Sequence, residues 1–208
     1  MAFHKIRVKI AKEVGDTAEE ARAYENVGKC YHRLGEFQKA LDYHELQLKT
    51  AKEEGERGVK GRGYGNMGNC YHSHGEFQKA LGYHELDLKI AKEVEVRAQK
   101  GRVYGNVGKC YHSLGEFQKA LDCHELHLKI AKEVGDKAEE GCASGNIGNC
   151  YHSFGKFRQA LEHYEYHRKM ATAVGDRTER KHVLTVILGT FSTVLDISKQ
   201  PLPFTNFA

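Results

Sequence analysis

The stretch GNVGKCYHSLGEFQKA, residues 105–120, decides how this sequence is interpreted, because close copies of it occur at three other places in the chain. Aligning the sequence with itself gives a period of forty residues without gaps, and the second and third units are identical at 28 of 40 positions. Repetition at this period is typical of stacked supersecondary units, so the sequence predicts one array. The array covers residues 1–180, with a partial unit at 1–20 and full units at 21–60, 61–100, 101–140 and 141–180.

The second half of each unit has the periodicity of a helix. In the third unit, Leu121, His124 and Leu128 recur at the three-and-four spacing of one helix face. Leu126, Ile130 and Val134 form a second apolar stripe beside the first. A helix that is apolar over two stripes is expected to pack on both sides.

The first half of each unit is also predicted to be a helix, with Tyr104, Val107 and Tyr111 on one face. Gly108 lies among these bulky residues, where a missing side chain would let the paired helix approach closely. Gly115 follows the helix at a position that favours a left-handed turn. Each unit is therefore predicted to be a helix–turn–helix hairpin, and the fold class to be all-α.

The repeat stops after Arg180, where an apolar segment begins. Its apolar stretch is shorter than the ~20 residues that a membrane-spanning helix needs, so no membrane span is expected. We predict a divergent apolar helix at 181–198 that covers the fourth unit, followed by a disordered tail at 199–208. Such a helix lacks the polar outer face of a terminal cap, so self-association through it is an expectation.

The composition excludes several function classes. The formal charge is +4, and lysine and glutamate alternate along the same segments, so a nucleic-acid partner is not expected. The N-terminus has no apolar segment of signal-peptide length, which favours a cytoplasmic location. Four of the six cysteines recur at the repeat period, and equivalent positions of stacked helices lie too far apart for disulfides. They are interpreted as reduced, buried residues.

Histidine and cysteine raise the question of metal binding or catalysis. Cys110 and His112 are two residues apart on a helix and therefore point to opposite sides, so they cannot ligate one ion together. Every plausible nucleophile or acid recurs with the period, whereas a catalytic constellation normally occurs once. We therefore expect neither an enzyme nor a cofactor, and keep a metal-binding Cys/His protein as a distant alternative.

The motif Tyr104-x-x-Val107-Gly108-x-x-Tyr111, followed by Ala120, resembles the tetratricopeptide repeat (TPR). The forty-residue period and the closing IAKEVGD resemble the repeats of G-protein-signalling modulators of the Pins/LGN type and related long animal arrays. The resemblance implies a right-handed α-solenoid of stacked hairpins that acts as a protein–protein interaction scaffold. The G-protein-binding motifs that follow the repeats in such modulators have no counterpart in this chain.

In this family the first helix of each hairpin lines a concave groove, so the polar stripe of these helices is the predicted site. Asparagine can hold the main chain of an extended peptide, and arginine and lysine select carboxylates, which predicts an acidic peptide as partner. The alternative is a structural fragment of a longer array with no independent binding. The predicted groove residues are Arg22, Asn26, Lys29, Arg62, Asn66, Asn69, Arg102, Asn106, Lys109, Asn146 and Asn149.

Overall fold

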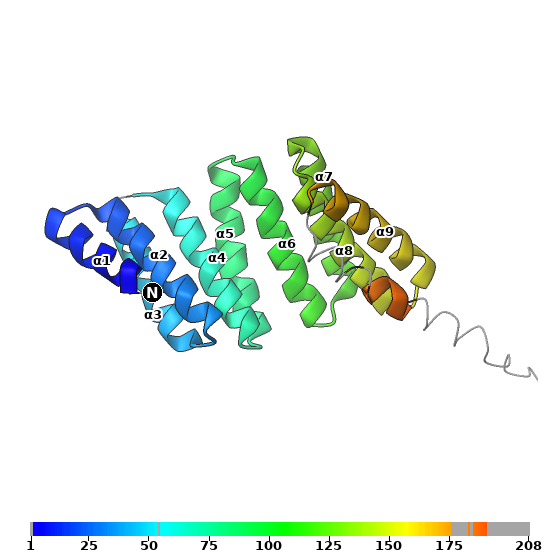
Figure 1. Ribbon diagram of the computed structural model, residues 1–208, viewed down its shortest axis with the longest axis horizontal. Helices are drawn as coiled ribbons and strands as arrows, with labels where there is room; N and C mark the ends of the chain where they lie inside the picture. The colour runs from blue at the N-terminus through cyan, green and yellow to red at the C-terminus, as the bar shows by residue number, and fades with distance from the viewer. Residues whose placement is uncertain (1, 54, 176–182, 184, 191–208) are drawn as a thin grey trace, which may run out of the picture. The chain divides into compact units, whose positions relative to one another are not determined.

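The computed structural model describes residues 2–53, 55–175, 183 and 185–190. Throughout these residues the regular secondary structure is α-helical, and no strand occurs among them (Figure 1). The chain divides into two compact units, Met1–Ile130 and Ala131–Ala208, which are described separately here. The predicted all-α fold of helix–turn–helix hairpins is confirmed.

The helices follow the forty-residue period. In the first unit, α1 packs against α2, and each helix from α2 to α5 packs against the next. The first helices of successive hairpins, α2, α4 and α6, also contact one another, and in the second unit α8 packs against α9. The bounds are α1 (Ala2–Val14), α2 (Thr17–Arg33), α3 (Phe37–Glu53), α4 (Arg57–Ser73), α5 (Phe77–Glu93), α6 (Arg97–Ser113), α7 (Phe117–Val134), α8 (Lys137–Ser153) and α9 (Phe157–Ala173).

A glycine in the left-handed conformation ends each first helix. Gly115 has a φ of 78°, and its N–H donates to the carbonyl of His112 at 3.0 Å. The N–H of Glu116 donates to the carbonyl of Tyr111 at 2.9 Å, which completes a Schellman motif. The predicted role of Gly115 is therefore confirmed. This motif satisfies two helix carbonyls and turns the chain into the second helix.

The connection between α5 and α6 departs from the other junctions between units. Glu95 has a φ of 53°, although glycine occupies the equivalent positions, such as Gly135. Val96 then precedes α6 without a side-chain cap, whereas the Asp136 carboxylate accepts a hydrogen bond from the N–H of Glu139 at 3.1 Å. This junction therefore lacks both the glycine and the capping aspartate.

The two helices of each hairpin cross closely at a glycine. A Cβ atom on Gly108 would lie 2.5 Å from the His124 ring, and one on Gly68 would lie 2.6 Å from the His84 ring. The predicted close approach at Gly108 is confirmed. His124 is only 1% exposed, so the large side chain on one helix fills the space left by the glycine on the other.

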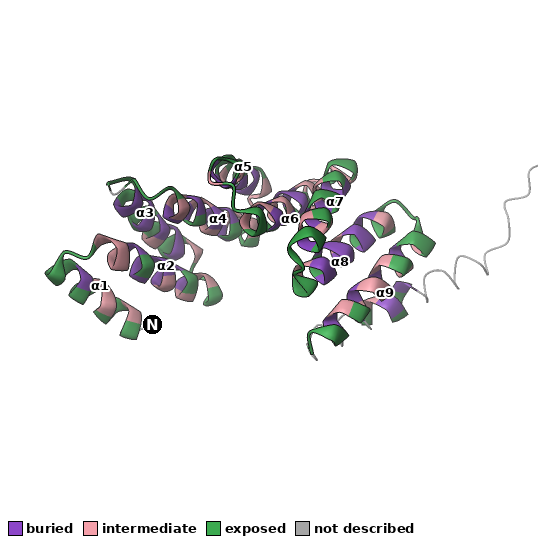
Figure 2. Cartoon of the chain, turned by 90° about the horizontal axis from the view of Figure 1, so that it is seen from above, coloured by how far each residue is buried: buried purple, intermediate pink, exposed green. Residues whose placement is uncertain are grey.

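The second apolar stripe that the sequence predicts on α7 is not fully packed. Leu126 is 42% exposed and Val134 is 41% exposed, so the expectation of packing on both sides is wrong for these residues. Exposed positions run along the helices beside the buried ones (Figure 2). The second helix of a hairpin packs through positions such as Leu121 and His124, and Leu126 lies outside this contact.

In the second unit, apolar side chains beyond α9 cover part of the last hairpin. Residues 185–190 are helical, and Val183 and Ile187 form a buried cluster with Ala160 and Tyr164 of α9. Most of the predicted helix at 181–198, and all of the predicted disordered tail at 199–208, lie outside the described residues. Both expectations therefore remain predictions.

Candidate functional site

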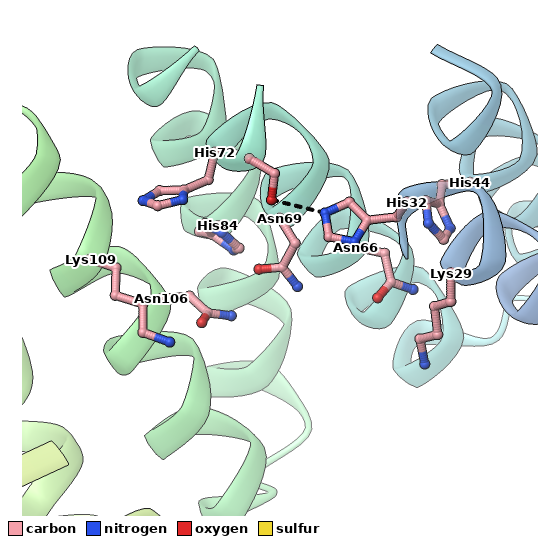
Figure 3. A pocket seen from close by; sticks show the side chains of 10 residues that line it. Lys29, His32, His44, Asn66, Asn69, His72, His84, Asn106 and Lys109 are labelled. Atoms are coloured by element: carbon pink, nitrogen blue, oxygen red, sulfur yellow. Dashed lines mark hydrogen bonds between the residues drawn. The ribbon is translucent and has the colours of Figure 1, made fainter. Parts of the chain in front are cut away.

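A pocket of about 390 Å³ lies in the first unit, where α2, α4 and α6 contact one another in turn. The second helices α3 and α5 each contribute one histidine to its wall. In Figure 3, Lys29 and Lys109 lie at opposite ends of the group, with the asparagines between them. No aspartate or glutamate is among the described residues that line the pocket, which are Lys29, His32, His44, Asn66, Asn69, His72, Ser73, His84, Asn106 and Lys109.

The structure brings several of the predicted groove residues together in this pocket and leaves others out. Lys29, Asn66, Asn69, Asn106 and Lys109 line it. They share one polar face because they are three residues apart within each helix or equivalent between helices. The predicted residues that do not line this pocket are Arg22, Asn26, Arg62 and Arg102 of the first unit and Asn146 and Asn149 of the second.

Sequence analysis missed the histidines in this pocket. His32 follows Lys29 by three residues, and His72 follows Asn69 by three, which places each pair on one helix face. Helical spacing is the signal that places these histidines on the same face as the predicted groove residues. His32 and His72 therefore extend the site beyond the asparagines and lysines.

His44 and His84 reach the pocket from the second helices through the gaps left by Gly28 and Gly68. Burial lowers the pKa of both imidazoles to about 4, so the rings are neutral near pH 7. Nδ1 of His44 lies 3.2 Å from Oε1 of Gln47. Nδ1 of His84 is buried and has no hydrogen-bond partner among the described residues. The inner wall of the pocket is therefore polar but uncharged.

Hydrogen bonds at the ends of the first helices connect successive hairpins. Nε2 of His32 lies 2.9 Å from Oγ of Ser73, and Nε2 of His72 lies 3.2 Å from Oγ of Ser113 (Figure 3 shows the first pair). The two pairs are forty residues apart and link α2 to α4 and α4 to α6. They hold neighbouring walls of the pocket in a fixed register.

Glu25 partly neutralises the two cations, Lys29 and Arg62, at one end of the site. Glu25 is 8% exposed. Its carboxylate accepts hydrogen bonds from Nζ of Lys29 at 2.5 Å and from Nε of Arg62 at 3.4 Å. Burial alone would raise the pKa of this carboxyl, but Lys29 and Arg62 outweigh that effect, so the pKa lies below its ordinary value. Glu25 is therefore ionised at neutral pH, and the predicted row of cations is partly balanced from within the chain.

The second buried carboxylate is that of Asp87, whose pKa is influenced by the charge of Arg102. Asp87 is 5% exposed, and its Oδ1 accepts from Nε2 of Gln99 at 3.3 Å. Burial raises the pKa of this carboxyl to about 6, although the Gln99 hydrogen bond and the charge of Arg102 act in the opposite direction. The Asp87 side chain fills the space beside Gly65. Gly65 occupies, in the second repeat, the position that Glu25 has in the first.

The described residues show neither a metal centre nor a transmembrane helix. No group of three or more histidine, cysteine, aspartate or glutamate side chains is arranged to hold a metal ion there. None of the helices in that part of the chain is both long and apolar enough to cross a bilayer. None of the six cysteines forms a disulfide, and burial raises the pKa of the Cys70 and Cys110 thiols to about 11.

Successive helical hairpins whose first helices present polar side chains to one pocket define a helical-repeat protein. The chain belongs to the tetratricopeptide repeat family, whose sequence profile matches residues 19–93 and 99–173. No curated protein sequence shows significant similarity to the chain.

Several solved structures share this fold at low sequence identity. BtubC (BKLC) from P. vanneervenii is 23% identical with a TM-score of 0.73, over 84% of this chain and 73% of that one. Aspartyl phosphate phosphatase F from Bacillus subtilis is 16% identical with a TM-score of 0.80, over 94% and 55%. A Rap protein in complex with competence and sporulation factor is 17% identical with a TM-score of 0.72, over 93% and 63%. The chain thus spans little more than half of the length of the phosphatase.

Proposed function

We propose that this chain is a protein-interaction scaffold that binds an extended, acidic peptide segment along α2, α4 and α6. Proteins of the tetratricopeptide repeat family are generally non-enzymatic interaction scaffolds, which supports the class of function. A Rap protein of similar fold forms a complex with competence and sporulation factor, so this fold can carry a ligand site. The observation that carries the proposal is the pocket lined by lysine, asparagine and histidine without a carboxylate.

The asparagines suit the main chain of an extended peptide. A side-chain amide both donates and accepts hydrogen bonds, so it can pair with a peptide N–H and C=O together. Nδ2 of Asn66 is buried and has no hydrogen-bond partner among the described residues, which leaves this donor available to a ligand. Asn66 and Asn106 are equivalent residues of successive repeats, so they would contact the peptide at successive positions.

The acidic character of the ligand follows from the charge of the predicted groove residues. Arg22, Arg62 and Arg102 are exposed on α2, α4 and α6, beside the asparagines. Exposed cations attract an acidic segment over several ångströms, and salt screens this attraction. We therefore expect the affinity to fall between 50 and 300 mM NaCl.

Selection from a library of random 12-residue peptides displayed on phage tests the proposal. The wild-type chain is expected to enrich peptides that contain acidic residues, and the variant Arg62→Ala/Arg102→Ala/Lys109→Ala is expected to lose this enrichment. A matched control replaces Lys49, Lys89 and Lys129, which are exposed on the second helices, and removes the same charge. If the control loses enrichment equally, or if the wild-type chain enriches nothing, the proposed site is wrong.

Two further expectations complete the proposal. A cytoplasmic location fits the absence of disulfides among the six cysteines, because disulfides are rare in reducing compartments. Self-association through the C-terminal apolar helix fits the 61% exposure of Leu188. Fluorescence microscopy of the tagged chain tests the cytoplasmic location. Light scattering over a range of protein concentrations tests self-association. The resemblance of the repeats to those of G-protein-signalling modulators of the Pins/LGN type stays a prediction.

A further inference from the structure

We infer that the pocket takes one anionic group of its ligand, a carboxylate or a phosphate, at Lys109, and that the equivalent position at Lys29 is already occupied by the chain's own Glu25. The inference rests on the proposed function, since it assigns charge specificity within the same site. Lys29 and Lys109 hold the same position in repeats that are eighty residues apart, and both line the pocket. They provide a matched pair of cations within one site.

The two lysines differ in the residue four positions before each. Before Lys29 this residue is Glu25, whose carboxylate accepts from Nζ of Lys29 at 2.5 Å and is also held by Arg62. A hydrogen bond of Gln47 to the same carboxylate, at 3.4 Å, further fixes its position. A ligand anion that approached Lys29 would therefore compete with a buried, oriented carboxylate. This end of the pocket is therefore expected to bind an anion less strongly than the end at Lys109.

Before Lys109 the equivalent residue is Gly105, which has no side chain to offer. The space that a side chain would fill is taken by the ring of His127, 2.7 Å from the position of a Cβ atom on Gly105. Lys109 consequently has no ion pair with any residue that the structure describes. An anionic ligand group would be its first carboxylate or phosphate partner in that part of the chain.

The neighbours of Lys109 are suited to the same anion. Asn106 lies on the same helix, and Asn69 and His72 lie on the adjacent α4 (Figure 3). Both asparagines carry amide N–H groups that can donate to an oxygen of the anion. Burial, and then the charge of Lys109, lower the pKa of His72, which indicates a positive potential in this part of the pocket. Charge-assisted hydrogen bonds to such an anion are about twice as strong as neutral ones.

Two buried polar atoms of pocket-lining residues have no hydrogen-bond partner among the residues that the structure describes. His84 is 1% exposed and lines the pocket, and its Nδ1 has no hydrogen-bond partner among the described residues. Nδ2 of Asn66 is in the same state. Unsatisfied buried polar groups are costly, so a ligand oxygen that accepts a hydrogen bond from Nδ2 of Asn66 would relieve this cost on binding.

The test uses the phage-displayed library of random 12-residue peptides on four proteins: the wild-type chain, Lys109→Ala, Lys29→Ala and Glu25→Gln. The wild-type chain and Lys29→Ala are expected to enrich peptides with an acidic residue at one shared position. Lys109→Ala is expected to enrich peptides without this acidic preference, because the asparagines still bind the main chain. Glu25→Gln keeps the shape of Glu25 but frees Lys29, so a second acidic position should appear.

The selected peptide is then synthesised with glutamate, phosphoserine or glutamine at the shared position, and its affinity is measured by fluorescence anisotropy. Glutamine should weaken binding to the wild-type chain about tenfold but leave binding to Lys109→Ala unchanged. Tighter binding of glutamate identifies a carboxylate as the ligand group, and tighter binding of phosphoserine identifies a phosphate. Circular dichroism and melting temperature check that each variant is folded.

The outcomes separate this inference from the proposed function. If the wild-type chain enriches no peptide, peptide binding itself is wrong and the inference fails with it. If it enriches peptides whose acidic preference survives Lys109→Ala, peptide binding stands and the inference is wrong. Loss of the acidic preference in Lys29→Ala rather than in Lys109→Ala would place the anion at the opposite end and also overturn it.

Discussion

The hydroxyl of Tyr164 on α9 donates a hydrogen bond to Oδ1 of Asn149 on α8, and the two oxygen atoms are 2.8 Å apart. In the first unit, His84 and Asn69 hold the equivalent positions, and the His84 ring contacts Gly68 as the Tyr164 ring contacts Gly148. The histidine thus keeps the packing against glycine but is ionisable. The last hairpin therefore provides a natural template for replacing a buried histidine by tyrosine.

We expect His84→Tyr to make the chain less sensitive to acid. Burial lowers the pKa of His44 and His84 to about 4 and that of His124 to about 3, compared with 6.5 for exposed histidine. Between pH 6.5 and 4 the unfolded chain binds protons that the folded chain does not, so folding stability falls as the pH falls. Each histidine contributes up to about 1.4 kcal/mol per pH unit. Urea unfolding at pH 7, 6 and 5 should give a smaller pH dependence for His84→Tyr.

Asp87 acts in the opposite direction over part of this range. Because burial raises its pKa to about 6, the folded state binds its proton before the unfolded state does, and acidification below pH 6 is stabilising. Three buried histidines outnumber one buried aspartate, so acidification is still expected to lower the free energy of unfolding.

The control for His84→Tyr is His74→Tyr, which removes an exposed histidine. An unchanged pH dependence in His84→Tyr would contradict the prediction.

The same substitution is expected to have opposite effects at two glycines. Gly108→Ala would place a Cβ atom 2.5 Å from the His124 ring, and relieving this overlap should cost about 1–3 kcal/mol, with Gly108→Leu at the upper end. Gly82 lies on α5 with no atom within 4 Å of the added carbon, so Gly82→Ala should stabilise by roughly 0.5–1 kcal/mol. Thermal unfolding compares them. Equal melting temperatures for the two alanine variants would be evidence against close packing at Gly108.

The junction before α6 is expected to be stabilised by copying the junction before α8. Glu95 adopts a left-handed φ of 53°, which costs a residue with a side chain about 1 kcal/mol, and Val96 offers no cap to the helix. Glu95→Gly/Val96→Asp restores the sequence found at residues 135–136 and should add about 1–2 kcal/mol. Urea unfolding of the two single variants and the double variant measures both contributions. No gain from Glu95→Gly alone would show that the backbone there is not strained.

Two adjacent residues test how the last hairpin is covered. Ile187 is 4% exposed and packs in a cluster with Ala160 and Tyr164, whereas Leu188 is 61% exposed. Ile187→Asp should bury an unpaired charge and destabilise the second unit by about 3 kcal/mol or more, while Leu188→Asp should have little effect. Limited proteolysis followed by mass spectrometry locates the loss of protection. Similar protection in both variants would mean that this segment does not cover the hairpin.

The hairpins could be predicted from the sequence because their determinants are local and repeated. Gly115 follows a helical pattern and takes the left-handed turn that this position requires, and Gly108 lies among bulky residues at the crossing. The exposure of Leu126 could not be predicted, because helical periodicity shows which residues share a face but not whether another helix covers that face.

The charge pattern of the site was less accessible to sequence analysis. Arg62 belongs to the second repeat, yet its guanidinium contacts Glu25 of the first, so the charge balance depends on how neighbouring hairpins pack. Asp87 lies on α5, outside the polar stripe of the first helices, and its side chain reaches α4 through the gap at Gly65. Such contacts between elements have no signature in the spacing of a single helix.

The contact between His124 and Gly108 also limits how such an array can change during evolution. A large ring on one helix and a glycine on its partner are two halves of one contact, so replacing either alone creates an overlap or a cavity. A gene segment that carries both halves can be copied or lost without disturbing them. Length variation by whole forty-residue units is therefore the permitted route, whereas gain or loss of a single helix would separate the ring from its glycine.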